Sequence, residues 1–249
     1  MSAIAPIRRQ VVVPVSSDRA FAAWTEQLHA WWPFARHSVY GEEATAAFVD
    51  GKLIETAPDG TSCSWGTVTT WEPGRRVTMT WHPGQSEDAA TTVDVQFDEI
   101  ADRQTLVTLT HSGWESRADS LEARADYRNG WATVVGLYAA SFSPSGEAES
   151  EHEPSWLVLQ HYVAPDVEGS PFASPLFAEH TAFLARASER DWLVAAGNLP
   201  DSPGSGMTIL RVPRANVSEA VAAAQDDDQS VAKGLFDVHV RPWNVALSR

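Results

Sequence analysis

The stretch SPSGEAESEHEP, which runs from Ser143 to Pro154, decides how the chain is organised. It contains four glutamates and no apolar residue larger than alanine, so it has nothing to contribute to a hydrophobic core. Its glutamates repel one another, and its Ser, Pro and Gly content is typical of extended linkers. We therefore predict an acidic, flexible linker at 143–154 between two domains at 1–142 and 155–249, and a length of 249 residues also favours two domains.

The composition argues against several classes of partner. The net charge is −15 and the basic residues form no stripe, so we expect no nucleic-acid binding. An acidic surface repels anionic lipids and no apolar run approaches the roughly 20 residues that span a bilayer, so we expect no membrane association. The amino terminus lacks the apolar core of a signal peptide and Cys63 is the single cysteine, which together predict a cytoplasmic protein.

Before the linker, the pattern changes from strand to helix to strands and back to helix. Residues 7–15 are rich in β-branched side chains and predict a strand. The next segment carries an apolar stripe at helical spacing and stops at Pro33; its members are Phe21, Trp24, Leu28 and Trp31. Alternating segments between about 44 and 113 predict an antiparallel meander with strands at 64–71, 76–81, 92–98 and 105–111. A long helix is predicted over 117–142, which makes this half α+β.

After the linker, six segments alternate in another order. We expect strands at 155–163, 192–196, 207–212 and 236–243, with helices at 174–190 and 217–225. The resulting order βαββαβ is that of a ferredoxin-like domain. The fold class predicted for the second half is therefore also α+β.

Several motifs in the first half resemble a known superfamily. They are Arg19–Thr25, Trp31–Pro33, Trp65–Val68, Trp71–Arg76, Thr78–Trp81, Thr105–Leu109 and Gly130–Trp131. In this order they are similar to the START-like (SRPBCC) superfamily, in the branch related to activators of the heat-shock-protein ATPase. The resemblance covers residues 7–142 and implies a helix-grip fold, an antiparallel sheet around a long C-terminal helix with a hydrophobic cavity between them.

The aromatic residues of this half are candidates for the walls of that cavity, because tryptophan and tyrosine combine an apolar body with one polar group. The candidate substrate-binding residues are Trp81, Tyr127, Trp131 and Tyr138, and the alternative for each is a place in the core. Arg128 and Asn129 are polar enough to orient a ligand.

The second half resembles the YCII-related family over residues 155–245. The matching residues are Glu179-His180, Trp192–Gly197, Asp226–Ser230, Gly234-Leu235 and Arg241–Trp243. The resemblance implies a dimeric α+β barrel with a His/Asp pair in a cleft, in which His180 is the histidine and Asp228 the best match to the aspartate. Gln229 stands where the family usually has proline. Asp226 and Asp227 are adjacent, so the aspartate position can shift by one or two residues.

His180 and Asp228 are the candidate catalytic residues. A partly buried histidine beside a carboxylate suits proton transfer near neutral pH. The alternatives are a core histidine satisfied by a backbone carbonyl, and an aspartate in a solvated acidic turn. Asp201 is a third candidate for the acid.

No metal or organic cofactor is expected from the motifs. Six other histidines lie in separate predicted elements without metal-ligand spacing; they are His29, His37, His82, His111, His161 and His239. The chain has no phosphate loop, dinucleotide fingerprint or serine-nucleophile elbow.

Three hypotheses for function follow. The first is an isomerase-like or lyase-like enzyme that acts on a small hydrophobic or aromatic molecule through His180 and Asp228, with the START-like cavity holding substrate or product. The second is a protein that binds or sequesters a hydrophobic ligand without chemistry. The third is a co-chaperone that activates an ATPase, which rests on fold-level analogy. We also expect a homodimer through the C-terminal domain, because a ferredoxin-like sheet with helices on one side leaves its other face to be covered.

Overall fold

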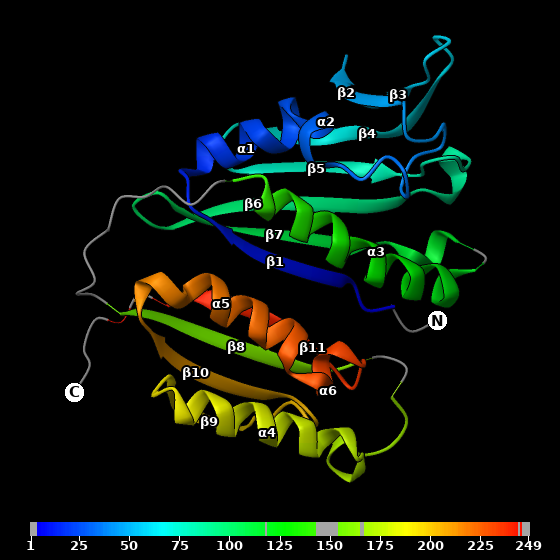
Figure 1. The fold of residues 1–249 in the computed structure, drawn as a ribbon. Helices are drawn as coiled ribbons and strands as arrows, with labels where there is room; N and C mark the ends of the chain where they lie inside the picture. Colours follow the sequence, from blue (N-terminus) through cyan, green and yellow to red (C-terminus); the bar gives the residue numbers. More distant parts are fainter. Residues whose placement is uncertain (1–3, 118, 143–153, 165–166, 244, 246–249) are drawn as a thin grey trace. The chain divides into compact units, whose positions relative to one another are not determined.

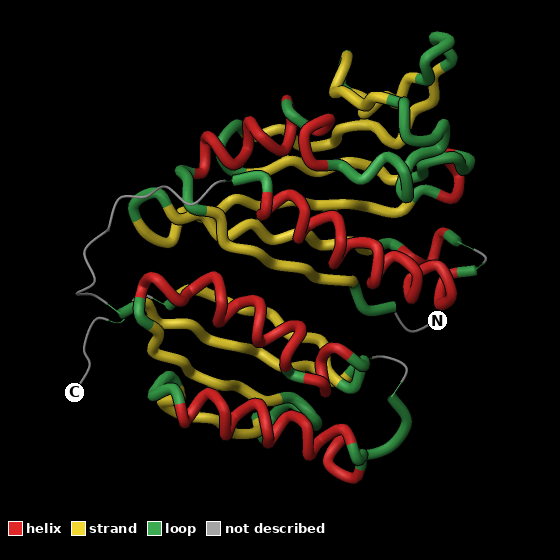
Figure 2. The backbone as a smooth tube through the Cα atoms, viewed as in Figure 1, coloured by secondary structure: helices red, strands yellow, loops and turns green. Residues whose placement is uncertain are grey.

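Two separate sheets organise this computed structural model, which describes residues 4–117, 119–142, 154–164, 167–243 and 245. The chain divides into two units, Met1–Ser145 and Gly146–Arg249. Each combines antiparallel strands with a few helices (Figures 1 and 2). Residues 143–153 of the expected linker lie outside the described residues, so the linker and the domain bounds 1–142 and 155–249 stay predictions.

The sheet of the first unit has seven strands in the order β1-β7-β6-β5-β4-β3-β2, and every neighbouring pair is antiparallel. The strands are β1 (Ile7–Val13), β2 (Thr45–Val49), β3 (Lys52–Thr56), β4 (Ser62–Glu72), β5 (Arg76–Trp81), β6 (Thr91–Ala101) and β7 (Gln104–Ser112). The helices are α1 (Ser17–Glu26), α2 (Leu28–Trp31) and α3 (Ser120–Ala140). Figure 1 shows α1 and α3 over one face of the sheet, an arrangement consistent with a helix grip.

The core of this unit is dominated by aromatic residues between the sheet and the helices. Six tryptophans are at most 5 % exposed: Trp24, Trp31, Trp65, Trp81, Trp114 and Trp131. Trp32 is 8 % exposed, and Trp71 is the exposed exception at 44 %, although its ring still contacts Phe21 edge to face. Most of the tryptophans in this unit are therefore structural or line a cavity.

Both helical regions of this unit differ from the prediction. The helix expected to continue to Pro33 breaks at Gln27, whose φ of −122° is not helical, and the apolar stripe continues from α1 into α2. The long helix begins at Ser120 rather than 117, because Gly113 has a left-handed φ of 79° and a 3₁₀ turn at Trp114–Ser116 follows it.

The second unit has a four-stranded antiparallel sheet in the order β11-β8-β10-β9. Its strands are β8 (Ser155–Val163), β9 (Leu193–Asn198), β10 (Gly206–Val212) and β11 (Phe236–Pro242). Its helices are α4 (Leu176–Glu189), α5 (Val217–Ala222) and α6 (Gln229–Ala232), with a π-helical turn at Ala223–Asp227 between the last two. Figure 1 shows α4 and α5 over the same face of this sheet.

Side chains alternate along the central strand β8. Leu157, Leu159 and His161 are buried, whereas Val158 is half-buried and Tyr162 is exposed. Since successive side chains of a strand point to opposite faces, the buried set lies on the face that the helices cover. The other face of the sheet carries the less buried set.

No helix in the described part of the chain is long and apolar enough to cross a membrane.

Candidate functional site

His180 lies in the middle of α4, on the side of the helix that packs on the sheet. Phe183 and Ala187, one and two turns further along the helix, are buried at 4 % exposure each, and the His180 side chain is 12 % exposed. This spacing keeps the imidazole on the apolar stripe. The ring is therefore mostly shielded from water yet reachable from one side.

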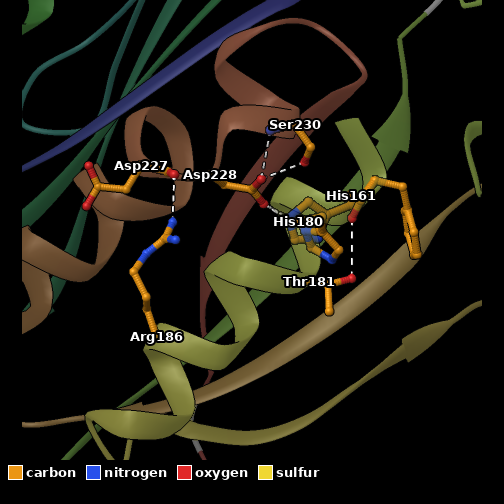
Figure 3. Close-up of polar contacts among 8 residues, drawn as sticks. His161, His180, Thr181, Arg186, Asp227, Asp228 and Ser230 are labelled. Carbon is orange, nitrogen blue, oxygen red and sulfur yellow. Dashed lines mark hydrogen bonds and ion pairs between the residues drawn. The ribbon is translucent and has the colours of Figure 1, made fainter. Parts of the chain in front are cut away.

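Asp228 joins the π-helical turn to α6 and is fully buried. Its Oδ2 lies 2.7 Å from Nδ1 of His180 (Figure 3). Its Oδ1 accepts hydrogen bonds from the backbone N–H of Ser230 at 3.0 Å and from the Ser230 hydroxyl at 2.6 Å. Of the three adjacent aspartates, Asp228 is thus the one that contacts the histidine. Arg186 donates a hydrogen bond to the backbone carbonyl of Asp227.

The charge of Asp228 follows from its contacts. Burial raises the pKa of this carboxyl, but the hydrogen bonds from His180 and Ser230 and the nearby imidazoles outweigh burial and hold the pKa below its usual value. An ionised carboxylate only accepts hydrogen bonds, so Nδ1 of His180 must carry the proton in this contact. In the neutral ring, Nε2 then has the free lone pair.

His161 also lies beside His180 and Asp228, although no sequence pattern connects it with them. It lies on β8, is 3 % exposed, and its ring centre is 4.7 Å from that of His180. Its Nε2 is 3.8 Å from Asp228 Oδ2, and neither ring nitrogen has a hydrogen-bond partner among the described residues. Burial and His180 lower the pKa of His161 to about 4, although Asp228 opposes this shift, so the ring is neutral at pH 7.

The cluster opens on a cavity of about 190 Å³. Aromatic side chains and the strand ends around a glycine-rich turn form its walls; among them are His161, His180, Phe172, Phe177, Gly206 and Phe236. Asp228 is behind the histidines, because it is fully buried. Asp201, the third acid considered, lies in an exposed turn. The site thus joins one partly accessible imidazole, one inaccessible carboxylate and one buried imidazole.

A second cavity of about 270 Å³ lies in the first unit. It is lined by Trp32, His37, Ser38, Val39, Trp65, Trp81, Pro83, Asp126, Tyr127, Gly130, Trp131 and Val134. Three of the four expected residues, Trp81, Tyr127 and Trp131, are among them. Tyr138 is not: the structure puts it in the core, where its ring packs on Trp24 and its hydroxyl donates to the Ala20 carbonyl at 2.7 Å. Arg128 and Asn129 are also outside the described lining.

Buried hydrogen bonds hold the aromatic walls in place. Trp131 Nε1 donates to Nδ1 of His111 at 2.9 Å, and Nε2 of His111 lies 2.6 Å from the Thr91 hydroxyl. The Thr91 hydroxyl in turn donates to the Trp81 carbonyl at 3.0 Å. Burial, with Arg117 adding to it, lowers the pKa of His111 to about 3, so this histidine is neutral and structural. Trp81 Nε1 donates to the Tyr127 hydroxyl at 3.1 Å.

Glu55 anchors another wall of the same cavity. Its fully buried carboxylate accepts hydrogen bonds from Trp65 Nε1 at 2.6 Å, from the backbone N–H groups of Val39 and Tyr40, and from the Ser38 hydroxyl. Burial raises the pKa of Glu55, but these hydrogen bonds outweigh it and the net shift is downward. One carboxylate therefore ties the 38–40 loop to the Trp65 side chain.

The family that matches this chain lies within the first unit. Residues 14–136 match the family model described as "Activator of Hsp90 ATPase homolog 1-like protein". This segment is therefore an AHSA1-like domain of SRPBCC type. No protein matches the chain in a search of the curated proteins.

Several solved structures are similar to the chain. CalU16 from Micromonospora echinospora is 18% identical with a TM-score of 0.39, and the match covers 56% of this chain and 76% of that chain. The Aha1 dimer from Colwellia psychrerythraea is 20% identical with a TM-score of 0.42, covering 58% and 100%. A structure described as "an anthrahydroquino-Gama-pyrone synthase Txn09 complexed with SUM" is 26% identical with a TM-score of 0.41, covering 57% and 100%.

Proposed function

We propose that the protein is an enzyme of proton-transfer chemistry, with His180 as the general acid and base and Asp228 as its partner. The observation that carries the proposal is the 2.7 Å contact between His180 Nδ1 and Asp228 Oδ2 at the wall of a cavity. The reaction class is an isomerisation or elimination in which Nε2 takes a proton from one atom of the substrate. The same nitrogen returns that proton to another atom or to the leaving group.

The charges support this role. When Nε2 takes up a proton the imidazole becomes a cation, and the buried carboxylate of Asp228 stabilises it. Ser230 holds the other carboxylate oxygen, so the acceptor stays aimed at the histidine. A positioned group of this kind contributes roughly 10²–10⁴-fold to a rate.

The cavity indicates the class of substrate. Its volume of about 190 Å³ is below the roughly 300–1,000 Å³ typical of drug-sized ligands. Phe172, Phe177 and Phe236 supply apolar, aromatic walls. These walls suit a small hydrophobic or aromatic molecule with one acidic C–H or O–H group near His180.

We infer that the second unit is a YCII-like, ferredoxin-like domain of the dimeric α+β barrel type. Such a domain suits the proposed proton-transfer chemistry. Its strand order β11-β8-β10-β9 with two helical crossovers supports the assignment. On the sheet face away from its helices, Val158 pairs across the ladder with Ile209 and Arg241, and Tyr162 is 41 % exposed. We infer that a second copy covers this face, which makes the protein a homodimer through its C-terminal domain.

A second candidate function is hydrophobic-ligand binding in the first unit. The AHSA1-like fold and the tryptophan-lined cavity of about 270 Å³ favour it. In this case the domain holds the substrate or product of the second unit, or sequesters an unrelated ligand. A co-chaperone role would rest on the family's description alone, and we do not propose it. The proposed location is the cytoplasm, where the single, free Cys63 stays reduced.

Proton exchange tests the leading proposal without knowledge of the substrate. Chelator-treated protein is incubated in D₂O with a panel of small aromatic ketones and enol lactones, and loss of their α-proton signals is followed by NMR. We expect exchange in the wild type and an exchange rate roughly 10²–10⁴-fold lower in His180→Gln. His239→Gln, which changes a residue on the opposite sheet face, should exchange at the wild-type rate. Equal exchange in wild type and His180→Gln contradicts the proposal. Binding without exchange favours the second candidate.

A further inference from the structure

His161 has an environment that the proton-transfer proposal does not explain. Both of its ring nitrogens are buried, and neither has a hydrogen-bond partner among the described residues. Leaving a buried polar group unsatisfied costs roughly 1–3 kcal/mol, and native structures rarely accept that cost without a bound water, an ion or a functional reason. The nitrogens face a neighbourhood that already contains His180 and a carboxylate.

These side chains form a recognisable set of ligands. One ligand atom from each of His161, His180 and Asp228 lies within 4.8 Å of the other two. Two imidazoles and one carboxylate suit divalent zinc, iron, cobalt or nickel, whereas calcium and magnesium prefer oxygen ligands alone. With three protein ligands and an adjoining cavity, such a set has the composition of an open, catalytic type of metal site.

We propose that His161, His180 and Asp228 bind a divalent transition-metal ion, with its open coordination positions toward the cavity of about 190 Å³. Ser230 is the outer-shell partner, because its two hydrogen bonds to Asp228 Oδ1 leave Oδ2 for the ion. The sequence analysis expected no metal site, because the histidines show no metal-ligand spacing. His161 and His180 do not have the sequence spacing of a metal-binding motif. The packing of α4 on β8 brings their rings together.

The distances require a small rearrangement. An ion at roughly 2.0–2.2 Å from each ligand keeps the ligand atoms about 3–3.5 Å from one another. Asp228 Oδ2 is 2.7 Å from His180 Nδ1 and 3.8 Å from His161 Nε2, values on either side of that range. The ligand atoms, which lie within 4.8 Å of one another, must therefore move into that range. His161 can supply that movement, since its ring has no hydrogen bond to break within the described residues.

Metal binding and the His180–Asp228 hydrogen bond exclude each other. Both use Asp228 Oδ2, and a ligand nitrogen of His180 carries no proton toward the ion. The metal site therefore goes beyond the proposed function and defines a second state of the same pocket. The two claims are separable, because the hydrogen bond exists in metal-free protein and the ion does not depend on any substrate.

Titration with Zn²⁺ and Co²⁺ tests the site. The whole chain is stripped with a chelator, titrated with Zn²⁺ by calorimetry, and titrated with Co²⁺ while its visible absorption is recorded. We expect one ion per second unit and Co²⁺ bands typical of nitrogen and oxygen ligands. His161→Asn and His180→Ala should each lose this binding. Ser230→Ala should weaken it by roughly 10–100-fold. The matched control is His239→Ala, whose residue pairs with Gln160 beside His161 but faces the other side of the sheet.

The results separate the two claims. Absence of a bound ion in the wild type overturns the metal site, as does binding that survives both His161→Asn and His180→Ala in proteins with wild-type circular dichroism. Because His180 is 12 % exposed on a helix, His180→Ala keeps the test decisive if the buried His161 variant fails to fold. The tautomer of His180 in chelator-treated protein tests the proton-transfer pair independently of either result.

Discussion

Ser230 donates its backbone N–H and its hydroxyl to the same carboxylate oxygen of Asp228, at 3.0 and 2.6 Å. Ser230 is itself fully buried, so these bonds are shielded from water. Ser230→Ala removes one of the two, and we expect the second unit to lose about 1–3 kcal/mol of unfolding free energy at neutral pH. Urea denaturation of the variant and of Ser188→Ala, which changes an exposed serine on α4, measures this loss. Equal stability of the two variants would contradict the role of Ser230.

The same variant should change the pH dependence of stability. Because the pKa of Asp228 is depressed in the folded protein, its charge stabilises the fold above the unfolded pKa, and this contribution disappears as the pH falls through the folded pKa. In Ser230→Ala the pKa of Asp228 should rise toward its ordinary value. The difference in stability between variant and wild type should therefore shrink on acidification.

His161 should make the second unit sensitive to acid. Its pKa is about 4 in the folded protein against about 6.5 in the unfolded chain, so between these values the unfolded state binds more protons. Stability should fall by up to about 3 kcal/mol as the pH drops from above 6.5 to about 4. His161→Phe removes the titrating group and should flatten this decline.

Hydrogen exchange of the amides in the second unit, in chelator-treated whole protein at several pH values, measures the effect. His239→Phe is the control, because His239 is half-buried on the other sheet face. An equally steep acid decline in His161→Phe and in wild type would show that His161 does not remain neutral in the folded state.

Glu55→Gln should loosen the cavity of the first unit. The carboxylate receives only donors, namely Trp65 Nε1, the Ser38 hydroxyl and two backbone N–H groups. A glutamine amide turns its own N–H₂ toward some of them, so we expect a loss of roughly 2–3 kcal/mol in stability. Binding of an apolar fluorescent probe should weaken as Trp65 and the 38–40 loop separate.

The matched control is Glu42→Gln, which changes an exposed glutamate in the neighbouring loop. Thermal unfolding and probe titration of both variants give the comparison. If Glu55→Gln behaves like Glu42→Gln, the carboxylate does not organise the wall.

If the protein is the proposed homodimer, substitution of Val158 should change its oligomeric state. This residue lies on the sheet face away from the helices, beside Ile209. Val158→Lys would bring two like charges together at a two-fold interface, which costs several kcal/mol. Sedimentation velocity should show a dimer for wild type and for Thr181→Lys, an exposed α4 position, and a monomer for Val158→Lys. A monomeric wild type at micromolar concentration contradicts the dimer.

Periodicity predicted most elements, the strands from alternation of apolar and polar side chains and the helices from apolar side chains three or four residues apart. The strand expected at 155–163 is β8 with those bounds, since one face of it is continuously buried. Strands β2 and β3 were not predicted individually, although Asp50 and Gly51 between them have positive φ values of 48° and 75° and are a typical hairpin pair. The helix expected at 217–225 ends at Ala222 and becomes a π-helical turn, which nothing in local propensity indicates.

The site residues also differ in how far the sequence could predict them. His180 and Asp228 were found because the resemblance named a histidine on the first helix and an acid after the second. His161 was missed since one histidine in an apolar alternating strand has the pattern of a core residue. His161 alternates with the buried Leu157 and Leu159 along β8. Its closeness to His180 is a tertiary contact that no local pattern contains. Tyr138 was assigned to the cavity on helical spacing alone, which does not distinguish a wall from the core behind it.

The most direct test of the proton-transfer pair is the tautomer of His180 in chelator-treated protein. Nitrogen-15 NMR at neutral pH should find the proton of the neutral ring on Nδ1, because the ionised Asp228 accepts it. In Asp228→Asn the backbone N–H of Ser230 takes the single amide oxygen, so the amide N–H₂ points at Nδ1. The ring should then switch to the Nε2–H form, while Asp227→Asn leaves the wild-type tautomer in place. A proton on Nε2 in the wild type, or the same tautomer in wild type and Asp228→Asn, would contradict the account.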